Sequence, residues 1–588
     1  MILQALVEHY EDLAAQGTLA HPGWSDAKIS YALYINDAGE LEQVADIRKI
    51  PEDGKGKPKP QKKRLPSPPT GRTSLAIKPT FLWDNSKYLL GIDNKGKAEQ
   101  SIKSFQGSRD FHHKLLDDVD SLAAQAVLAF FDRWDPGTAR EHPALADKLE
   151  DILAGANMVF RYNGAFLQDD PRIQEVWQDH YDFAGDGLEL LCLVTGQKGP
   201  AEPVHPSVKG VAGAQSSGAA LVSFNGDAFC SYGRKQSYNA PTSKYAAFAY
   251  TSALNHLLAE RDYVGRIGDT TVLFWASGGQ RAYQSFSVAS LFGAPTAYSA
   301  SDLQKMMLDL CQGKSVLFEE TQLDPSTTFY VLGLSPNAAR LSVRFFLKNS
   351  FGAFIQNIQA HQERLEIVRP SFDKFETLPL WKLLDATVNQ KSRDKSPSPG
   401  MAGETFRAIL NNTPYPASLL NGTVLRIRAE QRDKDHPDKP FKMTRERAAI
   451  LKAYYLKRPH SDMPKEVLTV SLNPDSTNIP YVLGRLFSVL EAIQSSANPG
   501  INTTIKDKYF NSASATPSRV FPTLINLAQK HLRKLDKGWS ISYSKQLTEL
   551  TAKLEEEFPD RLSLPQQGAF QLGYYHQTQA RYQKKSLE

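Results

Sequence analysis

The stretch FYVLGLSPNAARLSVRFF at residues 329–346 indicates where the chain forms a sheet. Two apolar runs, at 330–334 and 341–347, flank the tripeptide Ser335-Pro336-Asn337. Proline fixes φ and asparagine tolerates turn geometry, so this tripeptide predicts a turn between two strands. The surrounding sequence has the same character, and further strands are expected at 188–194, 219–224 and 270–276.

The regions on either side of these strands have different patterns. The first hundred residues read as α+β, with an amphipathic helix at 2–16 and a short strand at 30–35. A helical stretch follows at 111–153. After Pro464 the pattern is almost wholly helical, in four apolar stripes. These are Val482, Leu486, Val489, Leu490 and Ile493; Phe521, Leu524, Ile525, Ala528 and Leu532; Leu547, Leu550, Leu554 and Phe558; and Phe570, Leu572 and Tyr575.

The predicted fold class is α+β, a mixed α/β N-terminal body followed by a C-terminal four-helix bundle that could fold alone. We expect four regions. Residues 1–110 form an α+β region with a basic loop, 111–388 an α/β body, 389–462 a linker and helical connector, and 463–588 the bundle. The connector begins with a stretch at 389–400 rich in Lys, Ser and Pro, which is typical of an exposed linker.

Length and composition exclude several classes of protein. The chain has 588 residues, 41% hydrophobic and 23% charged, which indicates a soluble protein with more than one domain. No run approaches the roughly 20 apolar residues of a membrane span. Cys192, Cys230 and Cys311 have no paired spacing, which excludes a disulfide scaffold. The first residues form an amphipathic helix rather than a signal peptide, so we expect a cytoplasmic protein.

The positive charge is unevenly distributed. The net charge is only +5, but eight lysines and arginines lie between Arg48 and Arg64, against Glu52 and Asp53. Glycines and prolines interrupt this run, so we predict a basic loop rather than a helix face. Such a loop is either a solvated surface or a grip for nucleic-acid phosphates, because lysines bind backbone charge without reading sequence.

Known catalytic signatures are absent from the sequence. The glycine-containing segment 213–218 has Ala219 where a phosphate loop needs lysine. His112 and His113 are adjacent and cannot share a metal as i,i+4 histidines do. The acids Asp117, Asp118, Asp120, Asp169 and Asp170 could bind a nuclease metal, but surface acids are far commoner. We therefore expect a protein that is not an enzyme and needs no cofactor or metal.

Two further basic segments could contact nucleic acid. The turn SYGRKQSYN at 231–239 contains two cations and two tyrosines, which suits phosphate contact and base stacking. An equally good interpretation is a connection whose tyrosines pack inward. The C-terminal helices carry a basic face, although charged helix faces are usually only solvated.

Several long blocks of the sequence resemble a known family. They are MILQAL at the start, FLWDNSKYLLGID (81–93), HPSVKGVAGAQSSGAALVSFN with AFCSYGRKQSYNAP (205–241), DTTVLFWAS (269–277), AGETFRAIL (402–410), YVLGRLFSVLEAIQ (481–494) and INTTIKDKYFNSASATPSRVFP (501–522). In this order they resemble the large subunit of the subtype I-C CRISPR surveillance complex (Cascade), of the Csd-one type. Asn473 departs from the family, where aspartate is expected.

The resemblance implies a binding subunit rather than a nuclease. In such complexes the guide RNA reads the target by base pairing, while a protein subunit reads the short protospacer-adjacent motif (PAM) in duplex DNA. This chain would read the PAM, promote strand separation and R-loop formation, and help recruit the helicase–nuclease. Its expected partners are the target duplex, the guide crRNA ribonucleoprotein, the Cascade backbone and guide 5′-end subunits, and the small subunit, with no membrane. The main alternative is a chiefly structural scaffold subunit of the complex. A guide-processing or target-cutting nuclease is a less favoured alternative.

Candidate DNA-binding residues follow from the resemblance and the chemistry together. Asn85 offers a donor and an acceptor to a base edge, and Lys87 could anchor the neighbouring phosphate. An N-cap role for Asn85 is equally consistent with the sequence. The backbone candidates are Lys62, Lys63, Arg64 and Arg72, and the second candidate turn contributes Arg234, Lys235 and Asn239.

The C-terminal region has a further implied role. In subtype I-C systems the small subunit resembles this region and is made separately by internal translation initiation. Met463 is the last methionine and precedes the bundle, so it is the candidate start. The candidate contacts to the displaced strand are Lys506, Lys508, Lys530, Arg533 and Lys534.

Overall fold

The structure is a computed structural model. It describes residues 1–50, 56–66, 77–183, 188–433, 441–458, 462–501, 503–554 and 557–583. Helices hold 49% of the residues and strands 15%, with mixed sheets in the N-terminal part and helices in the C-terminal region, which confirms the α+β class. The chain divides into two compact units, Met1–Lys209 with Ser216–His256, and Gly210–Gln215 with Leu257–Glu588.

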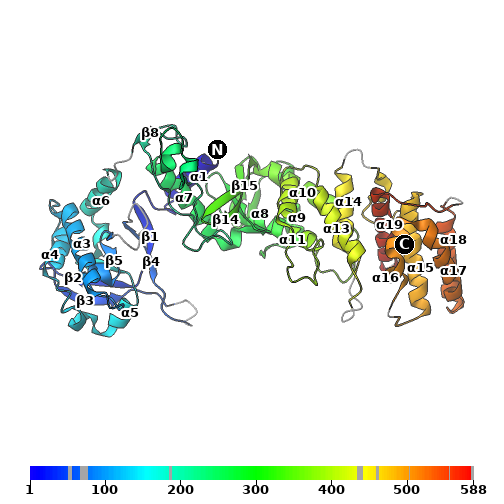
Figure 1. Cartoon of the computed structure of the whole chain (residues 1–588), viewed down its shortest axis with the longest axis horizontal. Coiled ribbons are helices and arrows are strands. Elements are labelled where there is room, and N and C mark those ends of the chain that lie inside the picture. The colour runs from blue at the N-terminus through cyan, green and yellow to red at the C-terminus, as the bar shows by residue number, and fades with distance from the viewer. Residues whose placement is uncertain are drawn as a thin grey trace. The chain divides into compact units, whose positions relative to one another are not determined.

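The first unit contains a mixed sheet with the strand order β3-β2-β6-β5, and β7 pairs with β6 (Figure 1). Only β2 and β6 run parallel. The strands are β2 (Tyr31–Ile35), β3 (Leu41–Asp46), β5 (Trp83–Asp84), β6 (Met158–Tyr162) and β7 (Ala165–Phe166). The helices of this unit are α1 (Ile2–Ala15), α2 (Ser86–Leu89), α3 (Ala98–Leu116), α4 (Leu122–Arg133), α5 (Leu149–Leu153), α6 (Pro171–Phe183) and most of α7 (Lys244–Ala259).

The two faces of this sheet are covered by different elements. Side chains alternate along a strand, so Leu33 and Ala32 point to opposite faces. Leu33 packs in a core with Phe130 and Phe131 of α4. Ala32 packs instead with Ile29 and Leu65 from a separate pair of strands, β1 (Trp24–Ile29) and β4 (Gln61–Pro66). This two-stranded ribbon therefore lies on the face of the sheet opposite α4.

The ribbon changes the interpretation of the basic segment. We predicted a loop from Arg48 to Arg64, but its last residues form strand β4, antiparallel to β1. The sequence of β4 is polar except for Leu65 and Pro66, and Leu65 is completely buried. Pairing with a strand more than thirty residues upstream overrides the local loop signal here, since strand preference depends strongly on packing partners. Lys55 lies outside the described residues.

The predicted strand at 219–224 is absent from the structure. Ala219 forms an isolated bridge with Val208, and no extended strand follows it. The predicted strand at 188–194 is shorter, β8 (Glu189–Leu191), and pairs with β9 (Lys198–Pro200). The apolar run at 219–224 is half-buried in irregular backbone, which periodicity alone does not distinguish from a strand.

The second unit begins with an antiparallel sheet in the order β10-β11-β14-β15. Its strands are β10 (Gly265–Ile267), β11 (Thr270–Ala276), β14 (Thr328–Asn337) and β15 (Arg340–Ser350), and β12 (Val316–Phe318) pairs with β13 (Thr321–Leu323). The strand predicted at 270–276 is confirmed. Its seven residues are all buried.

The hairpin of β14 and β15 turns two residues later than predicted. Ser335 and Pro336 belong to β14 and pair with Ser342 and Leu341. The reversal follows Asn337, and Ala338 has φ 52°. β11 pairs with β14 only as far as Leu334. Pro336 therefore lies in the part of β14 that has β15 as its single neighbour. Proline is tolerated there, because its missing N–H does not remove a hydrogen bond to β11.

Helices make up the rest of the second unit. They are α8 (Ala282–Phe292), α9 (Ala300–Cys311), α10 (Phe351–Leu365), α11 (Leu380–Asp385), α12 (Pro399–Leu410), α13 (Ala417–Ala429), α14 (Arg445–Leu456), α15 (Ile479–Ala497), α16 (Ile505–Ala515), α17 (Pro517–Leu532), α18 (Lys537–Thr551) and α19 (Leu564–Tyr582). The part of the chain described after Pro464 thus holds five α-helices, where four were expected. None of the described helices is long and apolar enough to cross a membrane.

The C-terminal helices pack tightly on one another and on the helices before them. A side chain at Gly484 of α15 would collide with the backbone of Phe570 in α19, and one at Gly573 with Tyr481. The hydroxyl of Tyr575 donates to Val368 O at 2.7 Å, and Arg428 donates to Gln567 Oε1 at 2.7 Å. The bundle is therefore bonded to the preceding part of the same unit.

Candidate nucleic-acid interface

The outer face of the β1–β4 ribbon is strongly cationic. Lys28 lies directly opposite Lys62 in the antiparallel register, and Asp26 lies opposite Arg64. All four residues are exposed. The Arg64 Nε is 3.6 Å from Asp26 Oδ1, whereas Lys28 and Lys62 form no ion pair with any described residue. Two like charges face each other without a counter-charge.

More lysines lie beyond the end of the strands. Lys49 and Lys59 form a bridge through two backbone hydrogen bonds of 2.9 and 2.8 Å. Both residues and Lys57 are exposed. We call Lys28, Lys49, Lys57, Lys59 and Lys62 the ribbon lysines. Arg48 does not belong to the set, because it is half-buried in bonds to Asp46 and Asp151.

The other two described backbone candidates are partly engaged within the protein. Arg64 hydrogen-bonds through its guanidinium to Gly17 O and Thr18 O at 3.3–3.4 Å. Lys63 points to the other side of the ribbon, and its Nζ lies 4.3 Å from the centroid of the Phe166 ring. Arg72 lies outside the described residues. The register that places Lys28 opposite Lys62 was missed in the sequence, since nothing local to either residue reveals it.

Asn85 is the N-cap of the short helix α2. Its Oδ1 accepts a hydrogen bond from Lys87 N at 3.1 Å. The preceding turn is fixed by buried Asp84, whose carboxylate accepts from Thr80 N, Thr80 Oγ1 and Asn85 N at 2.8–3.1 Å. The N-cap interpretation is therefore confirmed for the Asn85 oxygen. Its Nδ2 donates to no other described residue, and Asn85 and Lys87 are both half-buried.

A hydrogen bond links this turn to the ribbon. Trp83 Nε1 donates to the carbonyl of Pro66, the last residue of β4, at 2.5 Å. Trp83 also packs beside the small core under the ribbon. The structure therefore places the Asn85 turn next to the end of the strand that carries Lys62, which the sequence did not indicate.

The second candidate turn, at 231–239, is held rigid by Asn239. Its Oδ1 accepts from Ser231 N at 2.8 Å, and its Nδ2 donates to Arg234 O and Gln236 O at 3.0 and 2.9 Å. Both amide hydrogens are thus used inside the turn, so this geometry does not favour the predicted contact of Asn239 with DNA. Arg234 and Lys235 are exposed, and Tyr232 at the tip is fully exposed.

The C-terminal candidates divide into surface and interior residues. Lys508, Lys530, Arg533 and Lys534 are exposed, but Lys506 is buried. The Lys506 Nζ lies 4.3 Å from the ring centroid of Phe441 and 5.3 Å from that of Tyr574. Burial lowers the pKa of Lys506 below the usual lysine value. Lys506 is therefore a core residue, and its burial does not favour the predicted contact with the displaced strand.

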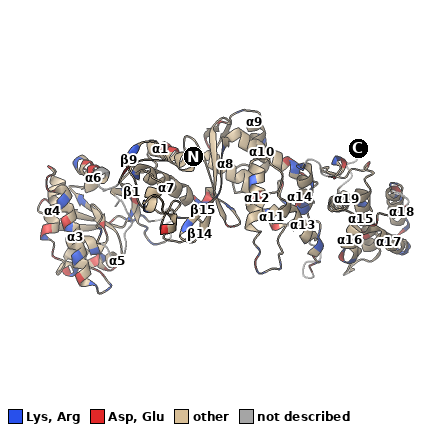
Figure 2. Cartoon of the chain, turned by 45° about the horizontal axis from the view of Figure 1, so that its top comes forward, with Lys and Arg blue, Asp and Glu red and all other residues tan. Residues whose placement is uncertain are grey.

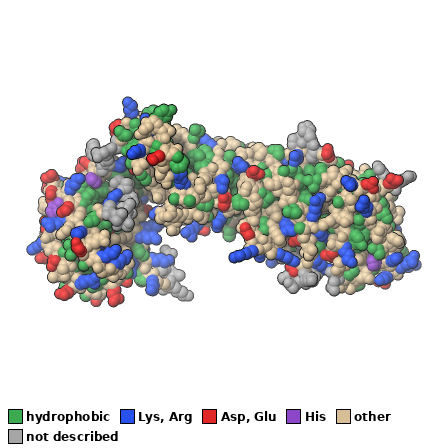
Figure 3. All heavy atoms as spheres, in the orientation of Figure 1, with side chains coloured by type: hydrophobic (Ala, Val, Ile, Leu, Met, Phe, Trp, Pro, Cys, Tyr) green, Lys and Arg blue, Asp and Glu red, His purple; other side chains and the backbone are tan. Residues whose placement is uncertain are grey.

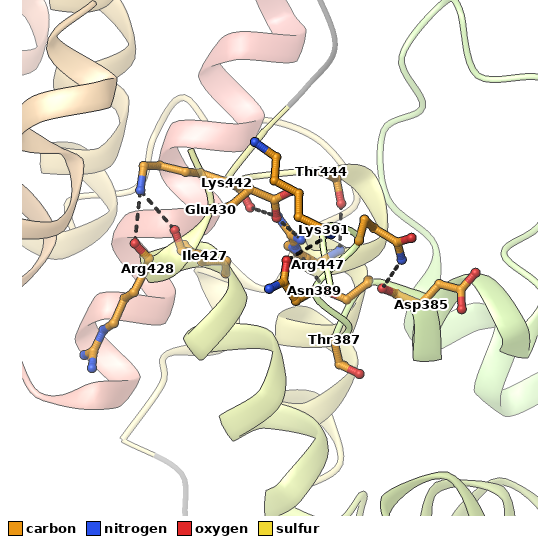
Figure 4. A network of polar contacts seen from close by, with 12 residues as sticks. Asp385, Thr387, Asn389, Lys391, Ile427, Arg428, Glu430, Lys442, Thr444 and Arg447 are labelled. Atoms are coloured by element: carbon orange, nitrogen blue, oxygen red, sulfur yellow. Dashed lines mark hydrogen bonds and ion pairs between the residues drawn. The ribbon is translucent and has the colours of Figure 1, made fainter. Parts of the chain in front are cut away.

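Other cations of this region are also structural. The buried Lys442 donates to the last carbonyls of α13, Ile427 O and Arg428 O, at 3.3 Å (Figure 4). Arg447, also buried, forms an ion pair with Glu430 and donates to Lys442 O at 2.9 Å. These contacts fasten α13 to α14. A cation count along the sequence therefore overstates the charge available to a nucleic acid.

Three of the acids considered as metal ligands have other partners. Asp170 accepts from Ser121 Oγ at 2.7 Å and from Arg172 N at 2.8 Å, as a helix cap does. Asp120 forms an ion pair with Arg172 at 2.9 Å, and Asp117 bonds to His113 at 2.7 Å. Among the described residues no group of three or more His, Cys, Asp or Glu side chains could hold a metal ion.

Figure 2 shows that both signs of charge alternate along α3 and its neighbours, so these helices resemble ordinary solvated surfaces. The ribbon lysines and the exposed C-terminal cations differ from them in lacking paired acids. They are the surfaces of the described chain best suited to bind phosphates.

Comparison with known proteins identifies the family. The comparison with curated proteins gave no match. A family model described as CRISPR-associated protein (Cas_Csd1) matches residues 6–582, nearly the whole chain. This match confirms the resemblance seen in the sequence, and the chain belongs to the Cas_Csd1 family, CRISPR-associated proteins of the Cascade type.

Proposed function

We propose that this chain is the large, non-catalytic subunit of an RNA-guided surveillance complex and that it recognises the PAM in duplex DNA. It promotes strand separation and R-loop formation beside that duplex, and its DNA-bound form helps recruit a helicase–nuclease. The guide RNA supplies the remaining sequence specificity by base pairing. Family membership supports this role, and the observation that carries it is the facing pair Lys28 and Lys62.

The physical argument starts from the cost of that pair. Like charges directly opposite each other on neighbouring strands destabilise a sheet. A bound phosphate backbone would relieve this repulsion and release counterions at the same time. A two-stranded ribbon is also an element that enters the DNA major groove. The ribbon lysines would thus set the position of the duplex without reading its sequence.

Base reading would fall to the turn beside the ribbon. Because the Asn85 oxygen caps α2, only its Nδ2 could contact a base edge, as a donor to a purine or thymine acceptor. Lys87, in the first turn of α2, would contact the adjacent phosphate. The exposed Arg234 and Lys235 are a second candidate contact to DNA, which they would make with the phosphates through charge alone.

We further propose that the C-terminal helices bind the displaced strand through Lys508, Lys530, Arg533 and Lys534. The same region would also be made separately as the small subunit, starting at Met463. In this chain Met463 is buried, and the ring of Tyr455, which the separate product would lack, packs close to Gly568. A separate product would therefore expose apolar surface that the full chain covers, and it would need a partner to bury that surface.

The experiment is duplex binding by the guide complex reconstituted with and without this chain. Matched protospacers would carry or lack the PAM. We expect tight binding of the PAM duplex only when the chain is present. Equal PAM preference without it would contradict PAM recognition and favour a scaffold role. Cleavage of labelled DNA or RNA by the chain alone would contradict the non-catalytic role.

A further inference from the structure

Trp539 at the start of α18 is an unusually exposed aromatic residue. Its side chain is 60% exposed. It stacks on Tyr543, with ring centroids 5.9 Å apart and an interplanar angle of 29°. Tyr543 is itself buried, and its hydroxyl lies 3.1 Å from Ser496 Oγ at the end of α15. The indole is therefore supported on one face while the other remains open to a ligand.

A cluster of cations precedes this ring in the sequence. Lys530, Arg533, Lys534 and Lys537 lie within residues 530–537, from the last turn of α17 to the first residue of α18, against the single acid Asp536. All four are exposed, and none forms an ion pair with a residue that the structure describes. Figure 3 shows Lys and Arg side chains at the edge of the molecule over α17 and α18.

Lys534 and the support of the ring lie at the same end of α15. Lys534 Nζ donates to Asn498 Oδ1 at 3.4 Å, while Ser496, two residues earlier, bonds to Tyr543 beneath Trp539. We call Lys530, Arg533, Lys534, Lys537 and Trp539 the α17–α18 corner.

This composition favours one class of ligand. A protein interface would present a larger apolar patch with few charged residues at its centre. The α17–α18 corner instead combines one flat ring with four cations that form no ion pair with a described residue. Single-stranded nucleic acid presents the complementary set, exposed bases that stack on aromatic rings and phosphates that attract cations. A duplex does not, because its bases are already stacked on one another.

We propose that the α17–α18 corner binds single-stranded nucleic acid, with one base stacked on Trp539 and the backbone phosphates bound by its four cations. The inference rests on the proposed function, in which the displaced strand is the single strand that the complex generates. The inference adds base stacking on Trp539 to a contact with the displaced strand that would otherwise depend on charge alone. Recognition of this kind is tolerant of sequence, since every base has a flat face.

The test is binding of labelled oligothymidylate to the full chain, with an abasic strand of equal length as the second probe. Trp539→Ala should weaken oligothymidylate binding about tenfold. It should leave binding of the abasic strand unchanged, because phosphate contacts remain. The affinity of Trp539→Phe for oligothymidylate should fall between those of the wild type and Trp539→Ala. Trp381→Ala is the matched control, since Trp381 is also a partly exposed tryptophan of this unit, at 44%.

Two results would overturn the inference. An equal loss on both probes would mean that Trp539 only supports the local structure. No loss on either probe would exclude stacking. The triple variant Lys530→Gln, Arg533→Gln and Lys534→Gln separates this inference from the proposed function. If that variant weakens binding and lowers its salt dependence while Trp539→Ala has no effect, displaced-strand binding by charge stands and stacking fails.

Discussion

Lys28 and Lys62 lie directly opposite each other on the antiparallel strands β1 and β4, and both are exposed without a counter-charge among the described residues. Their neighbours in the same register, Asp26 and Arg64, show the arrangement that stability alone would favour, opposite charges across the ribbon. The Lys28–Lys62 pair lowers stability, although the adjacent Asp26–Arg64 pair shows that opposite charges fit this ribbon. Such a local loss of stability is typical of a binding surface.

Reversing one charge of this pair should change stability and binding in opposite directions. Lys62→Glu places a carboxylate opposite Lys28, so the free energy of unfolding should rise by up to about 1 kcal/mol. Binding of duplex DNA should weaken, because a phosphate contact becomes a repulsion. Denaturant unfolding and duplex binding would measure the two effects on the same preparation. A variant that gained stability and kept its full affinity for DNA would contradict the role of the ribbon.

Asn85 should have two separable roles. Asn85→Ala removes the cap of α2 and should lower the free energy of unfolding by about 1 kcal/mol. Asn85→Asp keeps an oxygen that accepts from Lys87 N but removes the Nδ2 donor, so it should fold as stably as the wild type. Both variants should lose PAM discrimination in the assembled complex. If Asn85→Asp kept full discrimination, the residue would be a helix cap only.

Lys506 and Lys508 should respond differently to the loss of their charge. Lys506→Met leaves Glu491 and Tyr574 without the buried cation beside them, and the free energy of unfolding should fall by about 3 kcal/mol. Lys508→Met alters an exposed residue and should leave stability within about 0.5 kcal/mol. Thermal unfolding of the two variants would measure this difference. Equal stabilities would mean that Lys506 is not held in the core.

Acid should weaken the region around the Asn85 turn through His112. This histidine is fully buried, and its Nε2 accepts from Leu82 N at 2.9 Å while its Nδ1 donates to Ser108 O at 2.7 Å. Burial lowers the pKa of His112 from 6.5 to about 4. The unfolded chain therefore binds the proton more readily between these values.

The stability that neutral His112 contributes is thus complete above pH 6.5 and is lost as the pH falls towards about 4. The loss amounts to about 3 kcal/mol over this window. His112→Gln should be less stable at pH 7, and the fall in its unfolding free energy on acidification should be smaller than that of the wild type. Denaturant unfolding at several pH values would test this, and parallel pH profiles for the two proteins would contradict it.

The sequence predicted those elements whose signal is local. The strand β11 has seven consecutive buried residues, and α1 has a clear apolar stripe, so both are found where expected. Helix α16 was missed because few of its residues are strongly apolar. The strand β4 was missed because its residues are nearly all polar and it is stabilised by β1, more than thirty residues away.

The candidate site was predictable to a similar extent. The charge run identified Lys62, but the importance of Lys28 depends on the strand register, which the sequence does not reveal. Lys506 looked like a surface cation, and only the packing of Phe441 and Tyr574 around it shows that it is buried. Trp539 carried no signal as a single tryptophan, since its exposure follows from its position in the first turn of α18.

The central claim is that the ribbon and the Asn85 turn form the PAM-contacting surface. The most direct test is duplex binding by the reconstituted guide complex, on targets with and without the PAM, using wild type, Asn85→Asp and the double variant Lys28→Gln, Lys62→Gln. We expect the double variant to weaken both duplexes alike and to reduce the salt slope by about 0.9 for each lost phosphate contact. We expect Asn85→Asp to abolish the difference between the duplexes. Unchanged affinity, salt slope and PAM preference in both variants would contradict the account.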